Sequence, residues 1–139
     1  MRYLLDTNAL SEFRKKQPNL SVVIWLNQTE PETIYLSVIS VGELKRGIEK
    51  LTDKTRKQAL QAWLEDDLLV RFHGRLVGLG LEALLVWGTL VARLEAPGKP
   101  MPVMDSLIAA VATQGDFTLV TRNEADFAQT GVKTLNPWT

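Results

Sequence analysis

The sequence predicts a three-layer α/β/α sandwich built around a mainly parallel sheet. Apolar runs rich in strand-forming residues alternate along the chain with segments of helical periodicity, which is typical of parallel strands joined by helices. No internal repeat, linker or low-complexity segment divides the 139 residues, and this length suits one domain with its own core. We therefore expect a single domain over residues 1–139.

The composition excludes several classes of site. The sixteen basic and sixteen acidic side chains cancel, so a nucleic-acid partner would have to be held by a local patch and not by a global positive charge. The absence of cysteine excludes disulfides, thiolate zinc sites and thiol nucleophiles, and it is consistent with a reducing compartment. Because no signal peptide or membrane-spanning run is evident, we expect a cytoplasmic protein with no membrane partner.

The first strand is expected over Tyr3–Leu5, an apolar run that ends at Asp6. The two residues after Asp6 have the character of a helix cap, and a helix is expected from about Ala9 to Lys16. A carboxylate after a core strand, beside a helix start, lies where open α/β sheets place their ligands. An aspartate in this position can also be only a turn or cap residue, so a site requires other acidic residues to converge on it.

The remaining elements follow the same alternation. Further strands are expected over residues 33–38, 68–72, 117–121 and 132–135. Helices are expected over residues 20–28, 40–51, 53–64 and 79–96, from 105 onward, and over 123–127. Ser40 with Glu43 three residues later fits the capping box that opens a helix.

Three acidic residues lie at junctions between the expected elements. Asp6 follows the first strand, Glu43 lies in the first turn of one helix, and Asp105 lies at the start of another. If the strands are parallel, these junctions lie at one edge of the sheet and the carboxylates can converge. Converging carboxylates repel one another unless a proton or a cation neutralises them. Oxygen ligands in a chain with no cysteine and one histidine indicate Mg²⁺ or Mn²⁺, not zinc.

Each of these acids also has a purely structural interpretation. Glu43 can be the reciprocal arm of the capping box, and Asp105 can simply interact favourably with the helix dipole. His73 lies between two arginines with no nucleophile pattern around it, so we assign it no catalytic role. The glycines at 78 and 80 do not form a phosphate loop, because no Lys-Ser/Thr pair follows them.

Four motifs follow one another across almost the whole chain. They are Leu4-Leu5-Asp6-Thr7-Asn8, then Leu36-Ser37-x-x-Ser40-Val41-Gly42-Glu43-Leu44 with Gly47 after it, then Pro102-Val103-Met104-Asp105-Ser106-Leu107-Ile108-Ala109-Ala110, and finally Thr121-Arg122-Asn123-x-x-Asp126-Phe127. Together they resemble the motifs of the PIN-domain family, specifically those of the VapC/FitB-type ribonuclease toxins of type II toxin–antitoxin pairs. The terminal Asn136-Pro137-Trp138 also resembles the FitB-type ending.

The resemblance implies a Mg²⁺-dependent endoribonuclease, with Mn²⁺ as a substitute, whose acidic pocket lies at the carboxyl edge of the sheet. Carried over by position, Asp6, Glu43 and Asp105 are the acidic triad. Asp6 and Asp105 would hold the ion, and Glu43 would orient or deprotonate the attacking water. Where the family often has a fourth acid this chain has Asn123, whose amide offers a metal an oxygen but no charge.

This departure leaves the fourth position and the number of metal ions open. Glu124 or Asp126 could substitute for Asn123, although Asp126 fits better as a support of the short helix that contains it. Three further residues are expected to support the site or contact the substrate, with the first of them at the pocket floor: Thr121, Asn8 and Arg122.

The resemblance also implies partners. RNA is the expected substrate, and four basic residues beside the motifs are candidates to hold it: Lys45, Arg46, Lys99 and Arg122. A VapB-like antitoxin is expected to wrap the toxin, block the acidic cleft and connect it to operator DNA. A homodimer is also expected, with apolar positions on the N-terminal helices as its interface.

Two other functions compete with the nuclease. A catalytically weak PIN module, acting mainly in an antitoxin-mediated DNA-binding complex, is favoured by Asn123, whereas the three retained acids favour the enzyme. A metal-dependent phosphatase or phosphotransferase also ends its first strand with aspartate, but it needs a second aspartate where this chain has Asn8. The sequence leaves open which RNA is cut and at which bases.

Overall fold

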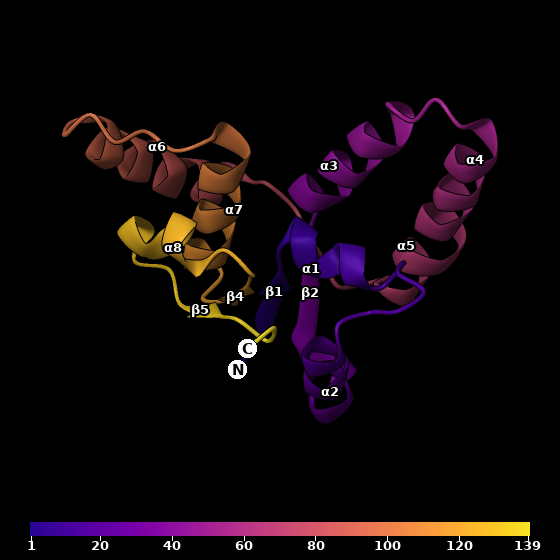
Figure 1. Ribbon diagram of the computed structural model, residues 1–139. Helices are drawn as coiled ribbons and strands as arrows, with labels where there is room; N and C mark the ends of the chain where they lie inside the picture. Colours follow the sequence, from indigo (N-terminus) through magenta and orange to yellow (C-terminus); the bar gives the residue numbers. More distant parts are fainter.

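The computed structural model describes residues 1–139 and contains a parallel sheet between two layers of helices (Figure 1). Its strands are β1 (Tyr3–Leu5), β2 (Ile34–Ser37), β3 (Leu76–Val77), β4 (Thr118–Val120) and β5 (Thr134–Leu135). They are arranged in the order β3-β2-β1-β4-β5, and all four pairings are parallel. The predicted fold class is confirmed.

Helices cover both faces of this sheet. They are α1 (Thr7–Glu12), α2 (Leu20–Gln28), α3 (Val38–Glu49), α4 (Lys54–Ala62), α5 (Leu69–Arg71), α6 (Leu81–Glu95), α7 (Val103–Gln114) and α8 (Glu124–Phe127), with a π-helical turn at Trp63–Leu68 and 3₁₀ turns at Pro31–Thr33 and Ala128–Thr130. In Figure 1, α6, α7 and α8 form one arm above the sheet, and α3, α4 and α5 form the other. No helix combines the length and the apolar character that crossing a lipid bilayer demands.

The central strands are buried on both faces, and each face has its own core. Leu4 of β1 and Leu119 of β4 lie in the core shared with α6 and α7. Leu5 and Val120, the next residues on the same strands, lie in the other core with Leu36 of β2. Because successive residues of a strand point to opposite faces, strands covered on both sides must be apolar throughout. The short apolar runs therefore predicted these strands correctly.

The helices that contain Glu43 and Asp105 both begin at the carboxyl edge of the sheet. Ser37, the last residue of β2, is also the N-cap of α3, and its hydroxyl accepts a hydrogen bond from the backbone N–H of Ile39 at 3.1 Å. Helix α7 ends just before β4, so it runs antiparallel to the strands and its first turn lies at their carboxyl ends. Glu43 on α3 and Asp105 on α7 are thereby directed toward the edge where β1 ends at Asp6.

The segment 68–72, predicted as a strand, is helical. It continues α4 through the π-helical turn into α5, and the third strand lies later, at Leu76–Val77. Leu64, Leu68 and Phe72 are buried at a spacing of four, which is the period of a helix and not of a strand. A run of only five apolar and polar residues was too short to distinguish the two periods.

The starts of two helices also differ from the prediction. Ser37 caps α3, whereas the predicted cap Ser40 is fully buried and its Oγ has no hydrogen-bond partner. The capping box is therefore wrong, and Glu43 bonds instead to a residue of another helix. Helix α1 begins earlier than predicted, with Asp6 as its N-cap, and it ends at Glu12 rather than near Lys16.

Leu4 lies in one of the two buried cores, so shortening its side chain should destabilise the protein strongly. Leu4→Ala should lower the free energy of unfolding by about 2–5 kcal/mol, because the side chain is fully buried and its removal leaves a cavity. Val70→Ala, at a side chain that is 66% exposed on α5, is the matched control and should change it by less than about 0.5 kcal/mol. Urea denaturation measures both, and equal effects would contradict the described core.

Candidate active site

The site begins where β1 ends, at the point where the strand order reverses. The chain leaves β1 toward β2 on one side and later returns to β4 on the other. Open α/β sheets bind ligands in the crevice beyond the carboxyl ends of strands at such a point. Asp6 is the first residue after β1, and its backbone N–H donates to the carbonyl oxygen of Val120 at 2.9 Å. The backbone therefore holds Asp6 against the end of β4.

The carboxylate of Asp6 is held by two neighbouring threonines. Its Oδ1 accepts a hydrogen bond from the backbone N–H of Thr7 at 2.7 Å, and its Oδ2 accepts one from the Thr121 hydroxyl at 2.9 Å. Thr121 is itself oriented, because its Oγ1 accepts a hydrogen bond from the backbone N–H of Asn123 at 3.1 Å. Only 6% of Asp6 is exposed, so these bonds lie in a largely dry environment and fix the orientation of both oxygens.

Thr7 connects Asp6 to Glu43. The Thr7 hydroxyl donates to Oε1 of Glu43 at 2.8 Å, across 36 positions in the sequence. Since the backbone N–H of the same residue binds Asp6, one threonine positions two carboxylates. From the sequence, Thr7 is expected to be only a helix cap. Thr7 follows Asp6 directly and has a hydroxyl that can donate a hydrogen bond, and these two features of the sequence could have indicated that it also positions a second carboxylate.

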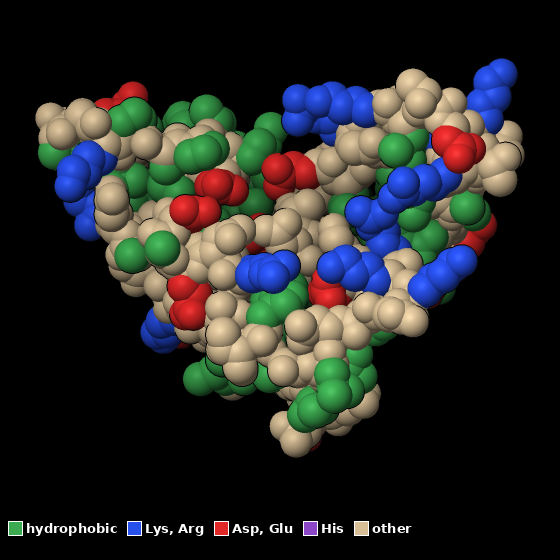
Figure 2. All heavy atoms as spheres, in the orientation of Figure 1, with side chains coloured by type: hydrophobic (Ala, Val, Ile, Leu, Met, Phe, Trp, Pro, Cys, Tyr) green, Lys and Arg blue, Asp and Glu red, His purple; other side chains and the backbone are tan.

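Asp105 approaches from the other arm, in the first turn of α7. It lines a hollow of about 310 Å³ together with Asp126 of α8 and with Lys99 from the loop before α7. Figure 2 shows acidic side chains gathered beside the notch between the two arms, mostly on the side of α7 and α8. We call the four acids at this edge of the sheet the carboxylate cluster: Asp6, Glu43, Asp105 and Asp126.

Burial and the charges of the carboxylate cluster raise the pKa of two of its members, Asp6 and Asp105. Burial raises the pKa of Asp6 above its usual 3.8, and the charges of Glu43 and Asp126 add to this rise, while the hydrogen bonds that Asp6 accepts oppose it. Burial also raises the pKa of Asp105, followed by the charges of the other three acids. These contributions to stability are present below pH 3.8 and are lost as the pH rises through the raised values. The ionised cluster is therefore costly at neutral pH.

The donor chemistry of the cluster suits a hard divalent cation, because carboxylate oxygens on separate elements are the ligands that Mg²⁺ and Mn²⁺ prefer. No group of three acidic or histidine side chains is arranged to enclose a metal ion in this structure. The oxygens of Asp6 and Glu43 that accept hydrogen bonds each keep a second lone pair for a ligand. A shared ion would require the side chains to draw closer than they lie here.

The other predicted site residues lie at the margin of the cluster. Asn123 is exposed, and it contributes the backbone N–H that orients Thr121. Asn8 is exposed on α1 and takes no part in the hydrogen-bond network around Asp6. Arg122 is also exposed, and its guanidinium lies 6.0 Å from the centre of the Trp138 ring.

Of the two acids that could substitute for Asn123, Asp126 is the one near the cluster. It shares the hollow with Asp105, and its charge raises the pKa of both Asp6 and Asp105. Glu124 instead accepts a hydrogen bond from the Thr134 hydroxyl at 2.8 Å. Residues two positions apart on a helix point in different directions, so only the orientation of α8 decides which acid faces the site.

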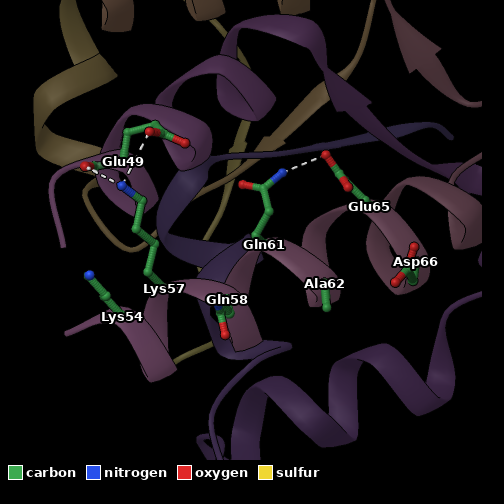
Figure 3. Close-up of a pocket in the computed structure, with 8 residues that line it drawn as sticks. All are labelled: Glu49, Lys54, Lys57, Gln58, Gln61, Ala62, Glu65 and Asp66. Atoms are coloured by element: carbon green, nitrogen blue, oxygen red, sulfur yellow. Dashed lines mark hydrogen bonds and ion pairs between the residues drawn. The ribbon is translucent and has the colours of Figure 1, made fainter. Parts of the chain in front are cut away.

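A hollow of about 470 Å³ lies apart from the carboxylate cluster, where the end of α3 faces α4 (Figure 3). Some of its polar groups pair with one another: Lys57 pairs with Glu49 at 3.4 Å, and the Gln61 amide donates to Glu65 at 2.6 Å. It contains no residue from the end of a strand. Although it is larger than the hollow at Asp105, it does not have the chemistry of the candidate site.

The threonine network predicts a pH-dependent cost for Thr121→Val. The variant loses the hydroxyl that stabilises ionised Asp6, so the free energy of unfolding should fall by about 1–3 kcal/mol at neutral pH. The loss should shrink on acidification, because that bond lowers the pKa of Asp6 and matters most when Asp6 is ionised. Thr118→Val is the control at a buried threonine of β4 outside this network. Urea denaturation at two pH values gives the comparison, and a pH-independent loss would count against the assigned role.

The chain is similar to known proteins over almost its whole length. The model of the PIN domain family matches residues 3–133. Plasmid stability protein StbB of Pseudomonas syringae pv. tomato and toxin FitB of Neisseria gonorrhoeae are each 36% identical over 135 residues, which are 97% of this chain and 97% of each relative. VapC ribonuclease Y4jK of Sinorhizobium fredii is 34% identical over 135 residues, covering 97% of this chain and 96% of that protein.

A solved structure shows the same fold at similar identity. The crystal structure of FitAcB from Neisseria gonorrhoeae matches with a TM-score of 0.90 and 35% identity, covering 98% of both chains. The family match covers most of the chain, and the relatives match it over nearly their full length. The chain therefore belongs to the PIN-domain family, and within that family it is similar to the VapC/FitB toxins of toxin–antitoxin systems.

Proposed function

We propose that this protein is a metal-dependent endoribonuclease and the toxin of a VapBC-type toxin–antitoxin pair. The observation that carries the proposal is the convergence of acids from the end of β1, from α3 and from α7 at one edge of the sheet, within electrostatic reach of one another. Relatives named toxin FitB and VapC ribonuclease support it. A cluster that is costly when ionised has a physical reason to bind a cation and, through it, a phosphate.

In the proposed reaction a water oxygen bonds to the phosphorus of an RNA phosphodiester, the P–O bond to the leaving nucleotide breaks, and the leaving oxygen takes a proton from solvent water. Asp6 and Asp105 would hold Mg²⁺ or Mn²⁺. When bound, the ion neutralises the cluster, polarises a phosphoryl oxygen and lowers the pKa of water. Glu43 accepts the proton of the attacking water, with its carboxylate fixed by the Thr7 hydroxyl. Thr121 holds Asp6 in one orientation and so acts through Asp6.

An antitoxin that covers the cleft is part of the proposal. FitAB bound to an IR36 DNA fragment matches this chain with a TM-score of 0.89 and 34% identity, covering 99% of this chain and 96% of that one. VapBC2 from Rickettsia felis, bound to a DNA fragment from its promoter, matches at 0.81 and 27%, covering 98% of each chain. Because the acidic and basic residues of this chain balance, we expect operator DNA to be reached through the antitoxin. The cytoplasm is the expected compartment.

We also propose a homodimer. The N-terminal helices were expected to supply an apolar interface. Helix α2 can do so, because it exposes Leu20 and Ile24. Helix α1 cannot, because its Ala9 and Leu10 are buried within the protein. A second set of exposed apolar side chains lies on α6 and at the start of α7: Leu81, Leu84, Leu85, Val103 and Met104.

Loss of single carboxylates should abolish RNA cleavage. With a mixed RNA pool and Mg²⁺, Glu43→Gln should lower the rate about 10²–10⁴-fold, as expected for loss of a general base. Asp6→Asn, Asp105→Asn and EDTA should have effects at least as large. Asp116→Asn, at an exposed aspartate that pairs with Lys133, is the control and should cleave normally.

The outcomes of this assay separate the candidates. Equal cutting by all samples, including the one with EDTA, would indicate a contaminating nuclease or another site. If the folded wild-type protein cuts no RNA with either metal but binds an antitoxin, the catalytically weak regulatory module is the better description.

Divalent cations should stabilise the protein in a pH-dependent manner. Mn²⁺ at ten times its Kd should raise the free energy of unfolding by about 1.4 kcal/mol, seen as a higher Tm. Binding should weaken on acidification at a pH above 3.8, because the pKa values of Asp6 and Asp105 are raised and a protonated carboxyl group is a poor ligand. Asp6→Asn/Asp105→Asn, measured at matched ionic strength, should show no shift. A shift of the same size in this variant would place the ion elsewhere.

A further inference from the structure

A hollow of about 220 Å³ lies between α1, α3 and α4 and shares part of its wall with the candidate active site. Glu43, the proposed general base, and Thr7, which positions it, both line this hollow. A ligand that fills the hollow therefore lies beside the reacting atoms. We call it the arginine hollow and define it by six of its residues: Thr7, Arg14, Glu43, Arg56, Leu60 and Trp63.

The two arginines of this hollow have no anionic partner within the chain. Arg14 and Arg56 take part in none of the ion pairs, whereas Lys45 of α3 and Lys57 of α4 both pair with Glu49. The carboxylate in the same wall, Glu43, is already bonded to the Thr7 hydroxyl. Two guanidinium groups in one hollow repel each other, so an external anion would stabilise them both. The planar fork of donors on each group matches the oxygens of a phosphate.

The rest of the wall is apolar and contains an aromatic ring. Trp63 is half-buried, packs against the core beneath it and lines the hollow beside Leu60. Any nucleobase can stack on such a ring, so this contact requires no particular RNA sequence. Bases in a duplex are already stacked and paired, so only a base that is free to turn outward can reach this wall.

The charges on the two arms differ in a way that suits a polyanion. In Figure 2 the basic side chains gather over the arm formed by α3 and α4, whereas acidic side chains surround the hollow near α7 and α8. A nucleic-acid strand is repelled by the acidic side and attracted by the basic one. It would approach along the basic arm, and the arginine hollow is where that arm meets Glu43.

We propose that the arginine hollow binds the nucleotide next to the bond that is cut in single-stranded RNA. Arg14 and Arg56 hold its phosphate, and Trp63 stacks on its base. The proposal rests on the proposed ribonuclease function and goes further by assigning a substrate subsite and an unpaired form of the RNA. The subsite also explains how a polyanion is held beside a cluster of negative charges.

The test measures binding and cleavage separately. Fluorescence anisotropy with a short labelled single-stranded RNA, in EDTA so that no cutting occurs, gives the Kd as a function of salt. Arg14→Ala/Arg56→Ala should weaken binding about tenfold or more and reduce the salt slope by about 0.7 for each phosphate that is no longer neutralised. Lys50→Ala/Lys54→Ala removes the same charge from the same arm outside the hollow, so it is the matched control and should change Kd less than about twofold.

The tryptophan provides an independent readout. Trp63→Leu should weaken binding about 5- to 100-fold with an unchanged salt slope, because stacking releases no counterions. Trp63→Phe keeps an aromatic face and should retain most of the affinity. If Trp63→Leu fails to fold, Trp63→Phe and the arginine pair still decide the matter. Duplex RNA of the same sequence should bind more weakly than the single strand.

The outcomes separate the subsite from its alternatives and from the proposed nuclease activity. Equal weakening by the arginine pair and the lysine pair would mean diffuse attraction without a site. Unchanged RNA binding by the arginine variant, together with loss of binding to an acidic peptide, would make the hollow a protein-docking surface. Metal-dependent cutting with normal KM in the arginine variant would leave the nuclease intact and reject the subsite. Selective loss of RNA binding, with no cutting by any sample, would retain the subsite and reject the nuclease.

Discussion

The parallel pairing of β1 with both β2 and β4 is the constraint on which the rest of the structure depends. It places Asp6 beside Thr121, which is 115 positions away, and it makes β1 the strand at which the order of the sheet reverses. Strands in this position must be covered on both faces, so the helices are divided between two layers. The helices that begin at the carboxyl edge then bring Glu43 and Asp105 to the same end of the sheet. The acidic site is thus a consequence of topology.

The ionised carboxylate cluster lowers the stability of the folded chain, and the rest of the fold compensates for this loss. Burial and mutual repulsion raise the pKa of Asp6 and Asp105, which means that the folded chain would be more stable with these groups protonated. Hydrogen bonds from Thr7 and Thr121 offset part of this cost at Asp6 but leave Asp105 without such support. Buried carboxyl groups with raised pKa values are common at functional sites, where residues needed for activity reduce the stability of the fold. The buried cores on the two faces of β1 stabilise the fold and so offset the unfavourable free energy of the cluster.

The cleft combines two opposite electrostatic environments. The acidic side, around α7 and α8, attracts cations, whereas the basic arm of α3 and α4 attracts polyanions. Glu43 belongs to both, because it is close enough to affect Asp6 and also lines the arginine hollow. A site that must bring a metal ion and a phosphodiester together needs both environments side by side. The balanced total charge of the chain conceals this separation.

The sequence by itself determined the sandwich, the three junction acids and the family, because apolar strands buried on both faces and acids at their ends leave patterns that are local in the chain. It failed where a local pattern was ambiguous: residues 68–72 are helical because Leu64, Leu68 and Phe72 pack together in the core, and that packing is tertiary. Only the folded chain decided that Thr7 links Asp6 to Glu43, that Asp126 and not Glu124 faces the cluster, and that Arg14 shares a hollow with Arg56. Each of these depends on how one element is oriented against another, and no spacing along the sequence records that orientation.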